Sequence, residues 1–119
     1  MPFMSVLTLV EADKSGEWIV SSPLIYVSNV GVEYVVPTGT TTDLASIPVG
    51  LRNIVNQNGK SRSPAVLHDF FYRTGSQPRN IADKLFYEAL LSKGVQKTTA
   101  YAMYIAVRLF GASSYNDKR

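Results

Sequence analysis

The spacing of apolar residues changes once along this chain, and that change limits the folds the chain can adopt. Before residue 37, apolar and β-branched residues alternate or run together at 4–10, 17–20, 24–28 and 31–36. From about residue 64 they recur at the spacing of a helix face. Strands followed by helices predict an α+β fold, with an N-terminal antiparallel β-meander of three to four strands packed on a C-terminal bundle of about three helices.

Turn-forming residues support this division. Serine, glycine, asparagine and proline separate the apolar segments near residues 14–16, 21–23 and 28–29, and Pro37 closes the meander. The segment 38–48 has neither period and is rich in small hydroxyl residues, so a loop is expected there. Residues 49–55 are compatible with a short helical turn.

Three helices are predicted in the second half. The first begins with Ser63 as N-cap and Pro64 in the first turn, and ends at Gly75. The second runs from about residue 78 to 93, with one apolar face, and Gly94 follows it. The third spans about 97–110. Because it is apolar on nearly all sides, we expect it to be the central buried helix.

With 119 residues, 45% hydrophobic and 18% charged, the chain fits one globular domain. We divide it into the β-meander at 1–37, a site loop at 38–63, helices at 64–112 and a tail at 113–119. It has no cysteine, which excludes disulfides, thiolate metal sites and cysteine nucleophiles.

No signal peptide or transmembrane segment is evident in the sequence. Residues 1–51 carry a net charge of −4 and residues 52–119 one of +7. The basic residues are scattered singly, which favours a solvated helical surface over a nucleic-acid partner. An anionic membrane surface stays open as a partner.

His68 is the only histidine, so a multi-histidine metal site is excluded. It can act as a general base if a carboxylate orients it. Adjacent helical side chains point about 100° apart, so Asp69 is not expected to do this, whereas Tyr72 shares the face of His68. Asp83 lies near the start of the next helix. If the two helices run antiparallel, Asp83 can orient His68.

The loop before these helices adds Asp43 and Ser46. Ser46 is a candidate nucleophile with His68 as its base, although no Gly-x-Ser-x-Gly elbow surrounds it. Asp43 is a candidate metal ligand together with Asp69, and hard oxygen ligands favour Ca²⁺ or Mg²⁺. Thr42 is a candidate binding residue, as is Tyr72 on the helix.

Each of these residues also has a purely structural interpretation. Asp43 or Ser46 can cap the following turn, and His68 can be a buried histidine bonded to a loop carbonyl. Asp69 can pair with Arg73 at i, i+4. Asp83 suits the first turn of a helix. Their occurrence together within ~40 residues is the argument for a shared site.

Four segments in order carry a resemblance: TDLASIP at 42–48, AVLHDFFYRTG at 65–75, ADKLFYEAL at 82–90 and AMYIAVRLFG at 102–111. Residues 34–112 are similar to a domain of unknown function found in tailed bacteriophages and prophages, with the pattern TDLAS-P, HDxxY, ADxxF and YxAVRxxG. The resemblance implies a phage or prophage origin and a late gene near tail or lysis functions. It implies the host cytoplasm during infection, or the virion, as location, and phage proteins or a host factor as partners.

The HDFFY segment also resembles the His-Asp-x-x-Tyr helix of phospholipase A-two enzymes. That resemblance implies that His68 activates a water, Asp69 binds calcium, Asp83 orients His68 and Tyr72 supports the hydrogen bonds. The family's calcium loop is glycine-rich and close to its helix. Here TGTTTDLASIP has one glycine and lies farther upstream, so Asp43 would have to replace the carbonyl ligands.

Two functions follow as expectations. One is a non-catalytic phage protein, virion (tail) or lysis associated, whose polar residues lock the loop to the helices. The other is a metal-assisted hydrolase of ester or phosphoester bonds with His68 as general base. Whether the protein is an enzyme is left open by the sequence.

Overall fold

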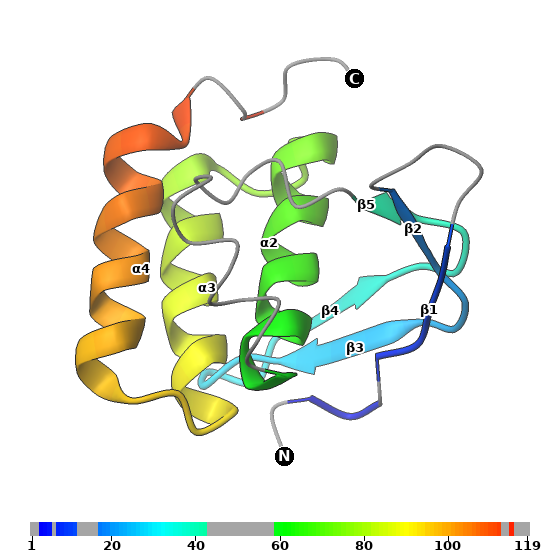
Figure 1. Cartoon of the computed structure of the whole chain (residues 1–119), viewed down its shortest axis with the longest axis horizontal. Coiled ribbons are helices and arrows are strands. Elements are labelled where there is room, and N and C mark those ends of the chain that lie inside the picture. The colour runs from blue at the N-terminus through cyan, green and yellow to red at the C-terminus, as the bar shows by residue number, and fades with distance from the viewer. Residues whose placement is uncertain (1–2, 6, 12–16, 43–58, 113–114, 116–119) are drawn as a thin grey trace. The chain divides into compact units, whose positions relative to one another are not determined.

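The computed structural model describes residues 3–5, 7–11, 17–42, 59–112 and 115. The chain forms two compact units, Met1–Asp43 and Leu44–Arg119. Antiparallel strands make up the described part of the first unit and three packed helices the second, so the α+β prediction is confirmed (Figure 1). The expected single domain and its four subdivisions stay a prediction.

Five short strands form the N-terminal unit: β1 (Leu9–Glu11), β2 (Trp18–Val20), β3 (Leu24–Val27), β4 (Glu33–Val36) and β5 (Thr41–Thr42). They pair antiparallel in two sheets, one in the order β1-β2-β5 and one of β3 with β4. In the first sheet Leu9 lies opposite Val20. In the second sheet Leu24 lies opposite Val36. Leu24, Val20 and Val36 are buried.

The predicted meander of three to four antiparallel strands differs in its pairing, because β2 and β3 do not pair. The chain changes direction at residues 21–23, where Ser21 N–H bonds to the carbonyl of Thr8 and Pro23 has no N–H to offer. β5 occupies the edge of β2 instead, with Trp18 opposite Thr42. The strands are therefore divided into two sheets at residues 21–23.

Thr41 and Thr42 were predicted to lie in a loop, and they form strand β5. Gly39 makes this pairing possible with a φ of 90°, a backbone conformation that favours glycine. Its N–H bonds to the carbonyl of Val20, and Val20 N–H bonds to the carbonyl of Thr40. The chain thereby turns after β4 and returns beside β2.

The C-terminal unit contains a 3-10 turn, η1 (Gly59–Ser61), and the helices α2 (Arg62–Thr74), α3 (Arg79–Ser92) and α4 (Lys97–Phe110). The bounds of α3 and α4 agree with the prediction. α2 begins earlier than expected, with Ser61 and not Ser63 at the N-cap. Pro64 is accommodated because the first turn of a helix has no intrahelical partner for its N–H groups. Gly75 ends α2 with a φ of 66°.

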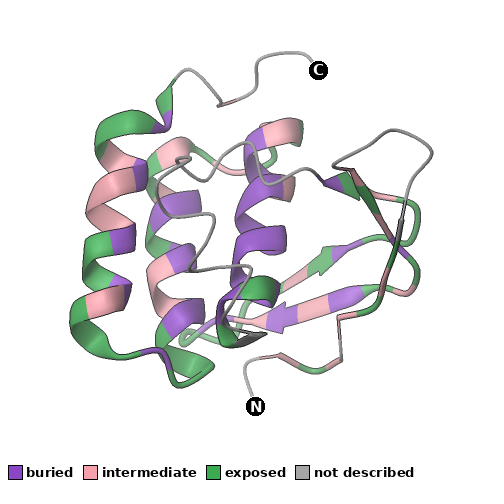
Figure 2. Ribbon diagram, in the orientation of Figure 1, coloured by how far each residue is buried: buried purple, intermediate pink, exposed green. Residues whose placement is uncertain are grey.

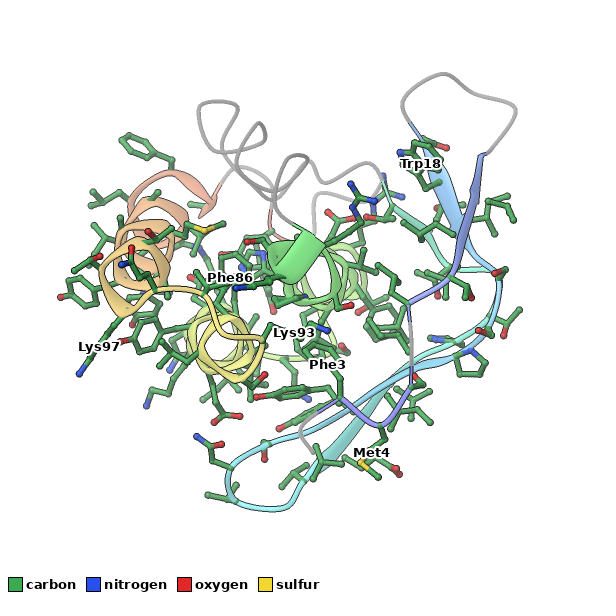
Figure 3. All side chains as sticks on the ribbon, turned by 60° about the horizontal axis from the view of Figure 1, so that its bottom comes forward. Phe3, Met4, Trp18, Phe86, Lys93 and Lys97 are labelled. Atoms are coloured by element: carbon green, nitrogen blue, oxygen red, sulfur yellow. The ribbon has the colours of Figure 1, made fainter. Side chains whose placement is uncertain are left out.

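The three helices share a core to which α3 contributes on two sides, because it packs against both α2 and α4. The apolar face predicted for α3 is buried throughout: Ala82, Leu85, Phe86, Ala89 and Leu90. Phe86 lies among the three helices (Figure 3). Ala65, Met103 and Val107 complete the same cluster from the neighbouring helices.

The prediction that the third helix is the central buried one was wrong. Only Ala100, Met103 and Val107 are buried among its described side chains, whereas α2 is buried along most of its length (Figure 2). Tyr101, Leu109 and Phe110 are exposed. α4 is apolar all round in composition, but it lies at the side of the bundle and only one stripe meets α3.

No helix within the described ranges is long and apolar enough to cross a membrane. The short turn expected at residues 49–55 lies outside the described residues.

Candidate functional site

The imidazole of His68 on α2 meets the carboxylate of Asp83 on α3. His68 Nε2 and Asp83 Oδ1 are 2.7 Å apart, and both side chains are fully buried. The two helices are joined by a short link that holds Gly75, so they lie side by side and bring these residues together. The rings of Tyr72 and Phe86 pack on the imidazole, with centroids 4.2 and 4.7 Å away.

Tyr72 joins the same carboxylate from one helical turn beyond His68. Its hydroxyl donates to Asp83 Oδ1 at 2.5 Å. The i, i+4 spacing on α2 therefore places two donors on one carboxylate oxygen. The ring of Tyr115 lies edge-on against Tyr72, with its centroid 5.2 Å away, and its hydroxyl donates to the carbonyl of Gln77 at 2.6 Å.

Two arginines complete this network from outside. Arg108 on α4 donates through Nη1 to Asp83 Oδ2 at 2.9 Å. Arg79 in the first turn of α3 donates through Nε to the hydroxyl of Tyr72 at 3.1 Å. Its Nη2 donates to the carbonyls of Val107 and Arg108, at 2.8 and 2.5 Å. The last turn of α4 is thus bonded to Asp83 directly through Arg108, and to Tyr72 indirectly through Arg79.

These donors keep Asp83 ionised. Burial by itself raises the pKa of a carboxyl group. The hydrogen bonds from His68, Tyr72 and Arg108 outweigh burial, and they hold the pKa of Asp83 below its usual 3.8. Asp83 is therefore a carboxylate at neutral pH, and all of its bonds in this network are accepted.

His68 is neutral at pH 7. Burial is the largest effect and lowers the pKa of His68 below its usual 6.5, against the Asp83 carboxylate, which raises it. Because an ionised Asp83 can only accept, Nε2 must carry the ring proton. The tautomer follows from this assignment of donors and acceptors, and it leaves the lone pair of the neutral imidazole on Nδ1.

Tyr72 stays protonated in this environment. Burial, and then the hydrogen bond to Asp83, raise the pKa of the phenol well above its usual 10.0. The hydroxyl therefore has one proton, which it gives to Asp83, and an oxygen that accepts from Arg79.

Asp69 points to a different partner, as the helical geometry predicted. Its Oδ2 lies 3.4 Å from Arg73 Nε, so the predicted i, i+4 ion pair is confirmed. The prediction that Asp83 lies in the first turn of its helix was wrong, because α3 begins at Arg79 and has no acidic residue there. Asp83 is one turn farther in, on the face that meets His68.

Of the predicted metal ligands Asp43 and Asp69, the structure describes only Asp69, because Asp43 lies outside the described residues. Within the described ranges, no group of three His, Cys, Asp or Glu side chains could hold a metal ion. Asp69 faces a guanidinium, which opposes a cation beside it. The described side chains thus do not form a ligand set for Ca²⁺ or Mg²⁺.

The other loop candidates are not brought into this network. Ser46 lies outside the described residues. Thr42, predicted as a binding residue, is buried in β5 opposite Trp18. The structure thus joins His68, Tyr72 and Asp83 and describes Asp69 beside them.

Sequence reasoning missed Arg79, Arg108 and Gly111 as parts of the site. A Cβ on Gly111 would lie 2.9 Å from the hydroxyl of Tyr72 and 2.5 Å from the carbonyl of Val107. Arg108 and Gly111 belong to the YxAVRxxG segment quoted above, which was a usable signal. Arg79 directly follows Pro78 at a helix start, and nothing in that position points to Tyr72.

The fold and site define an α+β protein with a buried His-Asp pair between two helices. The chain belongs to the family described as "Protein of unknown function (DUF1353)", which matches residues 18–107. It is 33% identical over 104 residues to "Uncharacterized protein y4jT" of Sinorhizobium fredii, covering 86% of this chain and 31% of that protein. The chain thus spans about a third of the relative's length. No solved structure matches the chain.

Proposed function

We propose that this protein is a hydrolase of ester or phosphoester bonds, with His68 as general base and Asp83 as the residue that orients it. The 2.7 Å bond between His68 Nε2 and Asp83 Oδ1 carries the proposal. It directs the ring proton to Asp83 and places the basic lone pair on Nδ1. A neutral imidazole at pH 7 is the form that a general base needs.

In the proposed reaction, Nδ1 of His68 takes a proton from water as the water oxygen bonds to the carbonyl carbon or phosphorus of the substrate. The Asp83 carboxylate stabilises the imidazolium that results. When the bond to the leaving oxygen breaks, the imidazolium returns its proton to that oxygen. An acid and an alcohol are the products.

The same division of roles supports the similarity to phospholipase A-two enzymes, in which an aspartate on the antiparallel helix orients the histidine. Tyr72 shares Asp83 Oδ1 with His68, which agrees with the supporting role that the similarity gives Tyr72. A Ca²⁺ or Mg²⁺ ion held by Asp69 and Asp43 belongs to the proposal only as a condition of the assay. No step is assigned to a cation, because the described residues form no ligand set.

A substitution at His68 tests the proposal. Purified protein is assayed on phospholipid vesicles, short-chain esters, phosphodiesters and peptidoglycan, each with and without added Ca²⁺ or Mg²⁺. We expect hydrolysis of one class, and a fall of roughly 10²–10⁴-fold in His68→Gln, whose amide can still donate to Asp83. His68→Asn is the shorter companion variant.

Lys84→Gln is the matched control, because Lys84 is exposed on α3. It should keep full activity. Wild-type protein that hydrolyses none of these substrates would overturn the proposal, and so would a His68→Gln protein as active as the wild type.

A second candidate is a non-catalytic phage or prophage late protein, virion or lysis associated. Exposed apolar side chains on α4 favour it: Tyr101 is 55% exposed, and Leu109 and Phe110 are 68% exposed. Aromatic side chains of this kind are enriched in protein interfaces. In this function the His68–Asp83 pair only fastens α2 to α3, and the exposed face of α4 contacts another phage protein or a host factor.

Mass spectrometry separates the two candidates. Particles induced from a strain that carries this gene as part of a prophage should contain the protein in stoichiometric amounts if it is a virion component. Its absence from purified particles would count against a virion role and leave the lysis or cytoplasmic location to be tested by fractionation of infected cells.

A further inference from the structure

We propose that Arg79 is a positioning residue that sets the direction of the hydrogen bonds between Tyr72, Asp83 and His68. It contacts neither His68 nor any reacting atom of the proposed function, and it acts through the Tyr72 hydroxyl. The consequence for catalysis rests on the proposed function. The consequence for the pKa of Asp83 does not.

The argument begins at the Tyr72 hydroxyl, which has one proton to donate. Arg79 Nε–H donates to the phenol oxygen at 3.1 Å. A guanidinium only donates, so the phenol proton cannot point toward Arg79. It is directed to Asp83 Oδ1, 2.5 Å away, and this oxygen becomes the acceptor of two bonds.

Arg79 is itself held by the end of α4. Its Nη2 reaches the carbonyls of Val107 and Arg108, which belong to the last turn of that helix. The carbonyls of a last helical turn have no intrahelical partners and carry partial negative charge, so a guanidinium is stabilised there. The arginine is therefore fixed on one side by backbone, and its Nε–H is aimed at Tyr72.

The shape of the guanidinium is essential to this arrangement. Nε and Nη2 lie on one rigid plane and serve acceptors from α2 and α4 at the same time. A lysine ammonium at position 79 carries the same charge from a single nitrogen at the end of a flexible stem. It could neutralise the carbonyls of α4, but it would not also present a fixed N–H to Tyr72.

The end of α4 thus acts on the His68–Asp83 pair through both oxygens of the carboxylate. Arg108 binds Oδ2 directly, and Arg79 acts on Oδ1 through Tyr72. With both oxygens held, the carboxylate is fixed in orientation, and Oδ1 faces Nε2 of the imidazole. The ionised carboxylate selects the Nε2–H tautomer by itself, so what the arginines determine is the orientation and the pKa of Asp83.

Nuclear magnetic resonance of ¹³C- and ¹⁵N-labelled protein tests the proposal, and the single histidine makes the assignment of the imidazole unambiguous. A ¹³C-detected pH titration of the Asp83 carboxyl group reports its pKa, while long-range ¹H–¹⁵N correlations check that the His68 ring keeps its Nε2–H form. We expect the Nε2–H form in the wild type and in Lys84→Gln, a charge-loss control on the same helix. Arg79→Lys and Arg79→Gln should both raise the pKa of Asp83, because the Tyr72 hydroxyl is no longer held toward the carboxylate.

The lysine variant separates position from charge. If charge alone matters, Arg79→Lys will give the wild-type pKa of Asp83, and the proposal is overturned. Tyr72→Phe serves as a second test that leaves Arg79 in place, and it should raise the pKa of Asp83 because the intermediate hydroxyl is gone. A wild-type pKa of Asp83 in folded Tyr72→Phe would equally contradict the proposal.

Kinetics then extend the test to the proposed function. In an active enzyme, both Arg79 variants should lower kcat by roughly 10- to 100-fold with little change in KM, because the base is displaced and substrate contacts are not. A raised Asp83 pKa in the Arg79 variants of a protein without hydrolytic activity would reject the proposed function and support the role of Arg79. An active enzyme whose Arg79 variants keep both kcat and the pKa of Asp83 would do the reverse.

Discussion

His68 Nε2 and Asp83 Oδ1 lie 2.7 Å apart although the two residues are separated by fifteen positions and lie on different helices. The nearer carboxylate, Asp69, is the next residue in the chain and forms an ion pair with Arg73 instead. The helix periodicity turns Asp69 away from the imidazole, and the packing of α3 on α2 brings Asp83 to it. The behaviour of this pair under mutation and pH follows from its burial and its donors.

Acid should destabilise the protein in two stages. The pKa of His68 is lowered in the native state by burial, so the unfolded chain binds a proton more readily. The free energy of unfolding is therefore constant above pH 6.5 and falls as the pH drops from 6.5 toward the native pKa. Asp83 has a lowered pKa, so its contribution is complete above 3.8 and is lost below that pH.

Urea denaturation at a series of pH values measures both stages. His68→Gln should remove the first stage and leave the second, because it has no group that titrates near pH 6.5. An unchanged slope between pH 6.5 and 5 in His68→Gln would show that other groups cause it.

Tyr72→Phe should lower the free energy of unfolding by about 1–3 kcal/mol. The change removes a donor from Asp83 Oδ1 and the acceptor of Arg79 Nε, and both groups are left in partly or wholly buried positions. Chemical denaturation monitored by far-ultraviolet circular dichroism measures the loss. Tyr101→Phe removes the same atom from an exposed tyrosine on α4 and should be neutral.

Arg108→Gln should raise the pKa of Asp83 relative to the wild type. The guanidinium donates to Asp83 Oδ2 and is one cause of the lowered pKa. Its loss makes the carboxylate easier to protonate, so the acid stage below pH 3.8 should move to higher pH. ¹³C-detected titration of the carboxyl group measures this shift, and Lys97→Gln, at the other end of α4, should leave the titration unchanged.

Gly111→Ala should destabilise the protein by about 1–3 kcal/mol through overpacking. Its φ is −85°, so an alanine meets no backbone strain there. The Cβ would instead lie 2.9 Å from the Tyr72 hydroxyl and 2.5 Å from the carbonyl of Val107. The variant is compared by thermal melting with Ala112→Ser, which adds an atom at the exposed neighbouring position. Equal melting temperatures for both variants would contradict the steric argument.

The fold could be predicted to the level of its elements. Alternation and helical spacing are local properties, so the strands near residues 18–20, 24–27 and 33–36 and the bounds of α3 and α4 followed from them. The pairing of strands could not, since β5 replaces β3 beside β2. Which strand edges meet depends on the path of the turns, and two threonines are too short to show a period.

The site was predictable in part for the same reason. Tyr72 shares the face of His68 by helix geometry alone, and Asp83 follows once two antiparallel helices are assumed. Arg79 and Arg108 could not be found this way. Their partners lie on other helices, and an arginine can reach many acceptors along its flexible side chain.

The sequence by itself determined that His68 and Asp69 diverge, because adjacent side chains on a helix cannot face each other. It also determined that Tyr72 lies beside His68 and that Gly75 separates two helices. Only the tertiary structure decided that Asp83 receives His68, Tyr72 and Arg108 together, and that Arg79 joins Tyr72 to the end of α4. Helical angles are set residue by residue, whereas the meeting of three helices depends on how their buried side chains fit.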